Sequence, residues 1–519
     1  MDIREKIREY EERRARFELG GGPKAIEKVH AGGRLTARER IEKLIDPGSF
    51  REFNLWAKPA LTGTRLDERE TPGDAVVTGF GKIEGRPICI YAHDFTVLGG
   101  TQAPVQNWKV CKAVDTAVRL GIPYVGIVDS GGVRVDDAFG PAQSGRGVSK
   151  DADVWYSPPM ALGVVPSISL VVGASFAGTA YSPMMADFFI MCDKPYCFMA
   201  LSSPSLLKTV TFVDVTYPEI GGARIHAEIS GSCDYFGKDE EDAIAATREI
   251  LTYLPSNCRE KPPFKDTGDD PNRRDDSLAD IIPSDLKQPY DMHEIILRLV
   301  DNTRFLELKR EYAKNIITGF ARLGGHSVGI VANNPAFLDG AMDLRSCEKE
   351  ARFIRTCDCF NVPLIFLVDT PGFVADPQQE KMGLMRHAAM AMYAICEATV
   401  PKITVYLRRC YKEGYFAMGT RLMGNDLLFA WPNAQIQLVD FKEAVETVYR
   451  RAVEEVAPEE LEQFSKKYFD SPYQAGALLM LDDIIHPRDT RALLIDALKT
   501  TANKQVVRPE KKRHGNIPL

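Results

Sequence analysis

Short apolar runs alternate with longer amphipathic stretches along most of the chain. The β-rich run PICIYAHDFTVL precedes the amphipathic stretch NWKVCKAVDTAVRLG, and the apolar run PYVGIVD follows it. The same order recurs later as HSVGIVANN, SCEKEARFIRTCDCFN and PLIFLVD. Alternating or continuous apolar runs predict strands, whereas apolar residues three or four apart predict helices. Repeated alternation of the two predicts an α/β fold with parallel sheets buried on both faces.

The two sets of predicted elements belong to one internal duplication. Residues 79–135 and 319–375 align without a gap and share 13 identities in 57 positions. Repetition on this scale indicates duplicated domains rather than a solenoid of short repeats. The stretch between the copies is rich in Pro, Asp and Arg and poor in apolar residues. We therefore predict domains at 1–260 and 286–519, joined by a linker at 261–285.

The first 50 residues are predicted to be a helical arm that packs on the first domain. Thr36 and Glu39 form a capping-box pattern before the run RERIEKLI, and Pro47 and Gly48 end that run.

Composition narrows the class of protein. The chain has 519 residues, of which 45% are hydrophobic and 26% charged, with a formal net charge of −7. These values are typical of a globular protein and give no indication of nucleic-acid binding. The N-terminus is charged, and no run of apolar residues is long enough to cross a bilayer, so we expect a cytoplasmic protein without direct membrane insertion. The 11 cysteines form no CxxC pair, so neither disulfides nor a metal site is predicted.

Glycine-containing turns are the candidate chemical sites. Residues 129–132 (DSGG, with Gly131 and Gly132) and 369–372 (DTPG, with Pro371 and Gly372) each follow a predicted buried strand. Ligands of parallel α/β sheets bind at such strand ends. Two later turns, Ser175–Tyr181 and Cys410–Gly414, are predicted to open helices, where unpaired N–H groups stabilise negative charge. This is the architecture of an oxyanion hole, although glycines in a single copy also suit a merely tight turn.

Other catalytic schemes fit the sequence less well. His93, His226 and His387 lie near the candidate turns, but their spacing matches no metal or catalytic motif, so hydrogen-bonded structural roles are expected. The sequence around Ser175 lacks the glycine spacing of a nucleophile elbow.

At these motifs the chain resembles the carboxyltransferase subunit of biotin-dependent acyl-CoA carboxylases, in the branch of propionyl-CoA carboxylase β and methylmalonyl-CoA decarboxylase or transcarboxylase. The resemblance covers nearly the whole length. The matching stretches are GRLTARERIEKLIDPGSFREF, HDFTVLGG, VDSGGVRV, AGTAYSPMMADF, YPEIGGARIHAEISG, NNPAFLDGAMD, LVDTPGFV, RHAAMAMYAICEATVPKITV, FAWPNAQI and HGNIPL.

The resemblance implies two tandem crotonase-like ββα-superhelix domains, an acyl-CoA side formed by the first and a biotin side formed by the second. A carboxyl group would move between carboxybiotin and the α-carbon of an acyl-CoA through an enolate held by two backbone oxyanion holes. Ala177 and Gly178 would supply amides to the thioester oxygen, and Glu413 and Gly414 would face the ureido oxygen of biotin.

Further site residues follow from the resemblance. On the substrate side they are Gly131, Gly132, Phe176, Tyr181 and Phe416. On the biotin side they are Pro371, Gly372, Phe373, Tyr411 and Lys412. Biotin would arrive on a separate carrier subunit, since no Ala-Met-Lys-Met sequence is present and Lys381-Met382 lacks the flanking residues. The implied partners are a biotin carboxylase and carrier subunit, and the implied assembly is a homohexamer, a dimer of trimers.

Departures from the family pattern leave alternatives open. The family's AGGAVY and AYGGAY read FAGTAY and CYKEGY here, which places a carboxylate, that of Glu413, at the second turn. It would repel a ureido anion unless it is paired, for instance with Lys412 or Arg409, or unless its side chain points elsewhere. The usual Ser-Leu-Gly stretch reads TQAPVQNWK, and Phe416 replaces an Asp, so an unusual acyl group is expected.

Three other functions remain open from the sequence. They are a decarboxylase subunit that works in the opposite direction, a degenerate scaffold subunit with little activity, and a crotonase-type hydratase or isomerase. The last would need no biotin and would use Glu413 or Asp137 as an acid–base.

Overall fold

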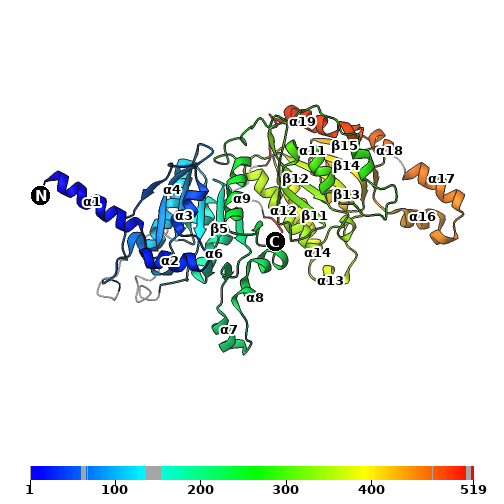
Figure 1. Cartoon of the computed structure of the whole chain (residues 1–519). Coiled ribbons are helices and arrows are strands. Elements are labelled where there is room, and N and C mark those ends of the chain that lie inside the picture. Colours follow the sequence, from blue (N-terminus) through cyan, green and yellow to red (C-terminus); the bar gives the residue numbers. More distant parts are fainter. Residues whose placement is uncertain are drawn as a thin grey trace. The chain divides into compact units, whose positions relative to one another are not determined.

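The structure is a computed structural model, and it describes residues 2–59, 66, 68–134, 154–469, 472–509 and 516–518. Asp137 lies outside the described residues. The chain divides into two compact units, Met1–Glu260 and Lys261–Leu519 (Figure 1). Each unit contains one large mixed sheet with helices packed on it, and the two sheets have the same strand order.

The elements of unit 1 follow the predicted alternation of strand and helix. Its strands are β1 (Arg51–Phe53), β2 (Val76–Ile83), β3 (Arg86–His93), β4 (Tyr124–Val128), β5 (Ser167–Val171), β6 (Ala174–Phe176), β7 (Phe188–Cys192), β8 (Phe198–Ala200) and β9 (Tyr235–Gly237). Its α-helices are α1 (Ile3–Glu18), α2 (Pro23–Ala31), α3 (Ala37–Leu44), α4 (Pro104–Leu120), α5 (Ser157–Ala161), α6 (Gly178–Met184), α7 (Pro204–Thr211), α8 (Tyr217–Gly221) and α9 (Glu240–Tyr253).

The main sheet of unit 1 has the order β1-β2-β3-β4-β5-β7-β9. The pairs β1–β2 and β2–β3 are antiparallel, and the later pairs are parallel. β4 and β5 are buried along their whole length, as predicted for central parallel strands. Strands β6 and β8 form a separate two-stranded parallel sheet. The chain leaves β5 at Gly173, where a Cβ would clash with the side chain of Asp129.

Unit 2 repeats this plan. Its strands are β10 (Phe305–Leu308), β11 (Ile316–Leu323), β12 (His326–Asn333), β13 (Leu364–Thr370), β14 (Lys402–Tyr411), β15 (Leu427–Ala430), β16 (Gln435–Gln437) and β17 (Asp483–Ile484). Its α-helices are α10 (Leu278–Ile281), α11 (His293–Leu299), α12 (Leu344–Cys359), α13 (Pro377–Lys381), α14 (Leu384–Glu397), α15 (Gly414–Ala417), α16 (Phe441–Tyr449), α17 (Pro458–Tyr468), α18 (Tyr473–Ala477) and α19 (Thr490–Thr501).

The sheet of unit 2 has the order β10-β11-β12-β13-β14-β15-β17, and β16 pairs with the end of β14. The long strand β14 therefore occupies the positions that β5 and β6 share in unit 1. The core lies between this sheet and helices α11 and α19, where Ile295, Ile403, Leu407 and Leu494 are buried. Burial of such side chains from water is the main force that stabilises each unit.

The predictions for the N-terminal arm and for the linker compare differently with the structure. Helix α3 begins at Thr36 with the predicted capping box to Glu39, which confirms that part of the arm. Residues 261–285, predicted as a linker, belong to unit 2. Arg273 donates to the backbone carbonyls of Arg298 and Val300, at 2.6 and 2.9 Å. Polar bonds thus hold Arg273 of this segment on unit 2, and the role of residues 261–285 as a linker stays a prediction.

Two features of the described residues bear on the class of protein. No helix among them is long and apolar enough to cross a bilayer. All 11 cysteines are free thiols, and most are buried.

Candidate active site

The first candidate turn lies between β6 and α6. Ala177 has φ 45° and ψ −112°, which is a strained conformation for a residue with a Cβ. Its N–H donates to the carbonyl of Ala200 on β8 at 3.2 Å. The next two N–H groups, of Gly178 and Thr179, begin the helix and have no hydrogen-bond partner among the residues that the structure describes. They are therefore available to a ligand.

The second candidate turn has the same construction. Lys412 follows β14 with φ 53°, and its N–H donates to the carbonyl of Gln437 on β16 at 2.9 Å. The N–H groups of Glu413 and Gly414 come next, with no partner in the described parts of the chain. Glu413 itself has an ordinary helical φ of −69°. The two turns correspond residue by residue.

This correspondence corrects one part of the sequence prediction. Ala177 was expected to supply an amide to the ligand, but its N–H donates to the carbonyl of Ala200. The available pair in unit 1 is Gly178 and Thr179, which matches Glu413 and Gly414 in unit 2. The positive φ at Ala177 and Lys412 also shows that the non-glycine residues at these positions carry backbone strain.

The strand-end turns lie against the helix-opening turns. Gly132 has φ 93°, and a Cβ there would lie 3.5 Å from the Cβ of Phe176. In unit 2, Gly372 has φ 108°, and a Cβ on Gly414 would approach its Cα to 3.0 Å. The positive φ favours glycine at Gly132 and Gly372, and the close approach to Gly372 leaves no room for a side chain at Gly414.

The carboxylates that open these turns hold their backbone in place. Asp129 accepts from Arg40 Nη1 at 2.8 Å and also from Arg34. Asp369 accepts from Arg408 Nε at 2.7 Å and Arg409 Nε at 2.8 Å. Both carboxylates are fully buried, and removing the arginine partners of such a group is strongly destabilising. Each turn is thus fixed by two arginines.

The other predicted site residues gather around the same turns. The Phe176 ring packs against Phe198 and Tyr217, with centroids 4.8 and 4.9 Å apart. Gly131 donates its N–H to Gly99 at 2.9 Å, and Phe373 forms a bridge with Met342 beside the half-buried Pro371.

Aromatic side chains complete the surroundings of both turns. Tyr181 on α6 is 44% exposed and lies edge-on to Trp155. The buried hydroxyl of Tyr411 donates to Gln435, and burial raises its pKa to about 12. Phe416 on α15 packs edge-on against Tyr415.

The charges at the second turn do not include the pairing of Glu413 with Lys412 or Arg409, which was one of the two alternatives left open by the sequence. Lys412 Nζ lies 3.1 Å from Asp440 and 3.3 Å from Glu443, at the start of α16. Hydrogen bonding to Asp440 raises the pKa of Lys412. Arg409 is held by Asp369 and Asp339. Neither cation pairs with Glu413, whose side chain is exposed.

Of the three histidines near the turns, two have the expected structural role. His226 bonds to the carbonyl of Met199 at 2.9 Å, and His387 to that of Gly383 at 2.9 Å. His93, at the end of β3, differs: its Nδ1 is buried with no partner among the described residues, and burial lowers its pKa to about 4. The sequence places His93 near the candidate turns, but no local pattern indicates that its Nδ1 lacks the hydrogen bond expected of a structural histidine.

Paired turns of backbone donors on duplicated domains are typical of enzymes that stabilise negative charge on an oxygen atom, and comparison with known proteins identifies the family. The model of the carboxyl transferase domain matches residues 28–517. The chain belongs to this family and is a carboxyltransferase of the biotin-dependent acyl-CoA carboxylases and decarboxylases.

Its relatives include carboxylases and decarboxylases alike. The chain is 40% identical to the propionyl-CoA carboxylase beta chain of Roseobacter denitrificans, covering 99% of each chain. It is also 40% identical to methylmalonyl-CoA decarboxylase subunit alpha of Veillonella parvula, over 100% of this chain and 99% of that one.

The solved structure of transcarboxylase 12S with methylmalonyl-CoA bound superposes with a TM-score of 0.93 at 38% identity, over the full length of both chains. The crotonase-like fold predicted from the sequence is thereby confirmed.

Proposed function

We propose that unit 1, with its helical arm, holds the acyl-CoA and that unit 2 holds biotin delivered by a separate carrier subunit. The observation that carries this proposal is the matched pair of turns. In each unit one N–H anchors the turn to a neighbouring strand, and the next two N–H groups are left for a ligand. Two such turns suit a reaction in which negative charge develops on two separate oxygens.

The residues of the chain act through these donors. The N–H groups of Gly178 and Thr179 donate to the thioester oxygen and stabilise the enolate that forms when the α-carbon loses its proton. The N–H groups of Glu413 and Gly414 donate to the ureido oxygen of biotin. One donor of this kind is typically worth about 3 kcal/mol of barrier. Carboxybiotin, when bound, would supply the carboxyl group. Its N–C bond would break and the same nitrogen would take the α-proton, so that an N–H bond replaces the N–C bond and a C–C bond replaces the C–H bond of the acyl-CoA.

The exposed carboxylate of Glu413 sets the electrostatics of the second site. No ion pair among the described residues neutralises it, and Lys412 is turned toward α16. Its charge opposes a developing anion on the ureido group. We therefore expect weak biotin binding, with the carrier subunit raising the local concentration of biotin.

The physiological direction is carboxylation or decarboxylation of the acyl-CoA. Equal identity to a carboxylase and a decarboxylase subunit supports both directions of the one half-reaction. Either direction uses the same two turns.

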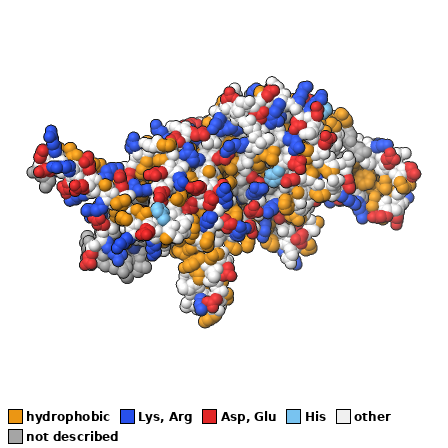
Figure 2. Space-filling model, in the orientation of Figure 1, with side chains coloured by type: hydrophobic (Ala, Val, Ile, Leu, Met, Phe, Trp, Pro, Cys, Tyr) orange, Lys and Arg blue, Asp and Glu red, His pale blue; other side chains and the backbone are white. Residues whose placement is uncertain are grey.

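A hexameric assembly is part of the proposal. The related transcarboxylase 12S assembles as a hexamer. Apolar side chains are exposed around α7 in unit 1, where Leu206 is 53%, Val210 67% and Phe212 89% exposed. Figure 2 shows hydrophobic side chains, mixed with polar and charged ones, on the projection that carries α7 in Figure 1. Apolar exposure of this kind marks surfaces that other chains cover. We propose that the hexamer works in the cytoplasm with biotin carboxylase and carrier subunits.

Two variants test which turn holds which ligand. Glu413→Gln should lower KM for free biotin several-fold and leave KM for methylmalonyl-CoA unchanged, in an assay of biotin-dependent decarboxylation. Gly178→Ala should lower kcat about ten-fold or more, because its new Cβ clashes with Gln102 and moves the thioester donors. Sedimentation of both variants checks that the assembly is intact.

The assignment is wrong if the effects are exchanged between the two variants. Decarboxylation that proceeds equally without biotin would instead support a hydratase-like or hydrolytic enzyme. Absence of turnover with every malonyl-type ester, with assembly retained, would support the scaffold.

A further inference from the structure

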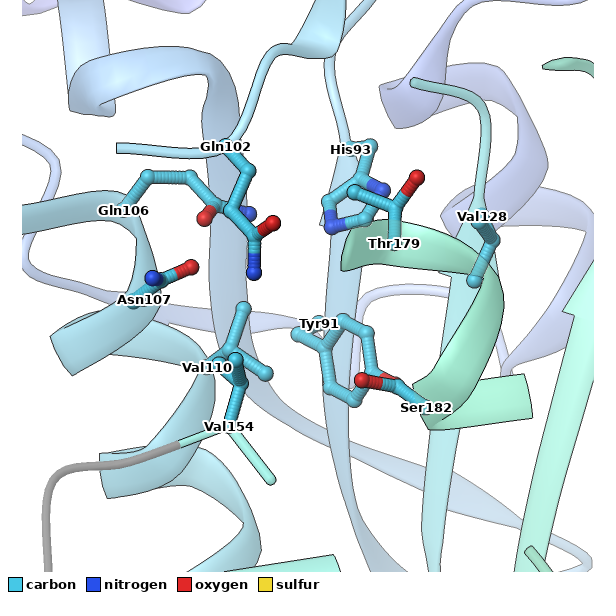
Figure 3. Close-up of a pocket in the computed structure, with 10 residues that line it drawn as sticks. All are labelled: Tyr91, His93, Gln102, Gln106, Asn107, Val110, Val128, Val154, Thr179 and Ser182. Atoms are coloured by element: carbon cyan, nitrogen blue, oxygen red, sulfur yellow. The ribbon is translucent and has the colours of Figure 1, made fainter. Parts of the chain in front are cut away.

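A small polar cavity lies behind the first turn in unit 1. It is lined by Tyr91, His93, Gln102, Gln106, Asn107, Val110, Val128, Val154, Thr179 and Ser182 (Figure 3). Its volume is about 10 Å³, about the space that one water molecule or one hydroxyl group needs. Thr179 belongs both to this cavity and to the proposed donor pair, so the cavity adjoins the place of the thioester.

Two lining side chains carry polar atoms without a partner. His93 is 5% and Gln106 1% exposed, and neither His93 Nδ1 nor Gln106 Oε1 has a hydrogen-bond partner among the described residues. A buried polar atom left unpaired is costly, and such atoms in native structures usually serve a ligand or water. The cavity is therefore built to receive a group that forms hydrogen bonds.

The framework around these side chains is fixed. The backbone N–H of Gln106 donates to Asp74 Oδ2 at 2.9 Å, and Arg134 binds the other oxygen of that carboxylate at 2.6 Å. The Gln102 N–H donates to Gly132 at 2.8 Å, and its side-chain oxygen fills the space that a Cβ on Gly178 would need. Both amides thus project from a held backbone toward the first turn.

The lining is uncharged. It contains no Asp, Glu, Lys or Arg, and the low pKa of His93 keeps its ring neutral at physiological pH. A carboxylate or ammonium group would lose its hydration without gaining a counter-ion there. A neutral hydroxyl group can donate to Gln106 Oε1 or His93 Nδ1 without that penalty.

We propose that this cavity selects an acyl-CoA that carries a hydroxyl group on the acyl chain close to the thioester. The inference rests on the proposed placement of the thioester at Gly178 and Thr179. It names the substrate class of that same site: short hydroxyacyl-CoA esters in preference to their unsubstituted counterparts. His93, Gln102 and Gln106 are then specificity residues.

The test compares 3-hydroxypropionyl-CoA with propionyl-CoA in biotin-dependent carboxylation by the complete enzyme, with calorimetric binding of both esters alongside. We expect kcat/KM to be about ten-fold or more higher for the hydroxy ester, which is the effect of one to two well-formed hydrogen bonds. Gln106→Leu should reduce that ratio toward one. Gln505→Leu, at an exposed position near the C-terminus, should keep the wild-type ratio.

The possible outcomes distinguish failure of the hydroxyl-binding cavity from failure of the proposed carboxyltransferase function. Equal or better use and binding of propionyl-CoA by the wild-type enzyme overturns the hydroxyl pocket, leaves the carboxyltransferase assignment intact and makes the cavity a water site only. Turnover of neither ester counts against the proposed function, and the binding ratio then still decides the pocket. A wild-type preference that Gln106→Leu leaves unchanged, with an unaltered melting temperature, also overturns the role of this cavity.

Discussion

Asp369 Oδ2 accepts a hydrogen bond from Arg408 Nε at 2.7 Å, and both side chains are buried. Asp369→Asn would leave the guanidinium groups of Arg408 and Arg409 without their buried counter-charge. We expect a loss of about 3–5 kcal/mol in the free energy of unfolding, measured with denaturant. Glu462→Gln, which breaks an exposed pair with Lys466, should leave the unfolding curve unchanged. A loss no greater than that of the control would show that Asp369 is not needed to hold the turn.

Ala177 carries the strain of a positive φ. Ala177→Gly should stabilise unit 1 by up to about 1 kcal/mol, because glycine adopts this conformation freely, although it loses more backbone entropy on folding. Ala180→Gly, inside α6, is the matched control and should destabilise by about 1 kcal/mol. Denaturant unfolding measures both. Destabilisation by both variants alike would mean that the turn is unstrained.

The stability that the protein gains from the contact of Lys412 with Asp440 and Glu443 should be lost both at low pH and at high pH. The pKa of Asp440 is lowered in the folded protein, so the stability it adds is present above its unfolded value and is lost as the pH falls. The pKa of Lys412 is raised, so its share is lost as the pH rises through that raised value.

Lys412→Met should therefore cost most between about pH 5 and 10. The cost should be less than about 1 kcal/mol, because these groups are partly exposed. The same variant at high salt should differ little from the wild type. A cost that persists unchanged in high salt and at pH 3 would exclude an ionic origin.

His93 should make the protein sensitive to acid. Burial lowers its pKa from 6.5 to about 4, so the unfolded state binds a proton more readily between those values. The stability linked to neutral His93 is complete above pH 6.5 and is lost as the pH falls toward 4. His93→Gln should flatten the decrease of unfolding free energy in this window by roughly 2–3 kcal/mol. An unchanged pH profile would show that His93 is solvated in the native state.

Much of the fold follows from the sequence because it depends on local patterns and on the duplication. The apolar runs at Tyr124–Val128 and Leu364–Thr370 are the buried strands β4 and β13. The amphipathic stretches are α4 and α12, and Gly121 ends α4 in the left-handed conformation that is common for glycine after a helix. Helices also open at both later candidate turns.

The details of the site depend on partners that are distant in sequence. The assignment of donors changed because Ala200 accepts the N–H of Ala177, and no local pattern at residue 177 reveals that bond. Lys412 pairs with Asp440 across 28 positions of the chain rather than with its neighbour Glu413. The unpaired Nδ1 of His93 likewise follows from burial by several elements together.

The break at Gly173 gives the two units different mechanical properties. In unit 1 the first turn is carried by the small sheet of β6 and β8, whereas in unit 2 the second turn continues the ten-residue strand β14 of the main sheet. A turn on a two-stranded ribbon can adjust its position at little cost to the core, and one that extends a central strand cannot. Under the proposed assignment, substitutions during evolution can change the acyl-CoA specificity of the first turn, while the second turn, which would bind biotin, keeps its shape.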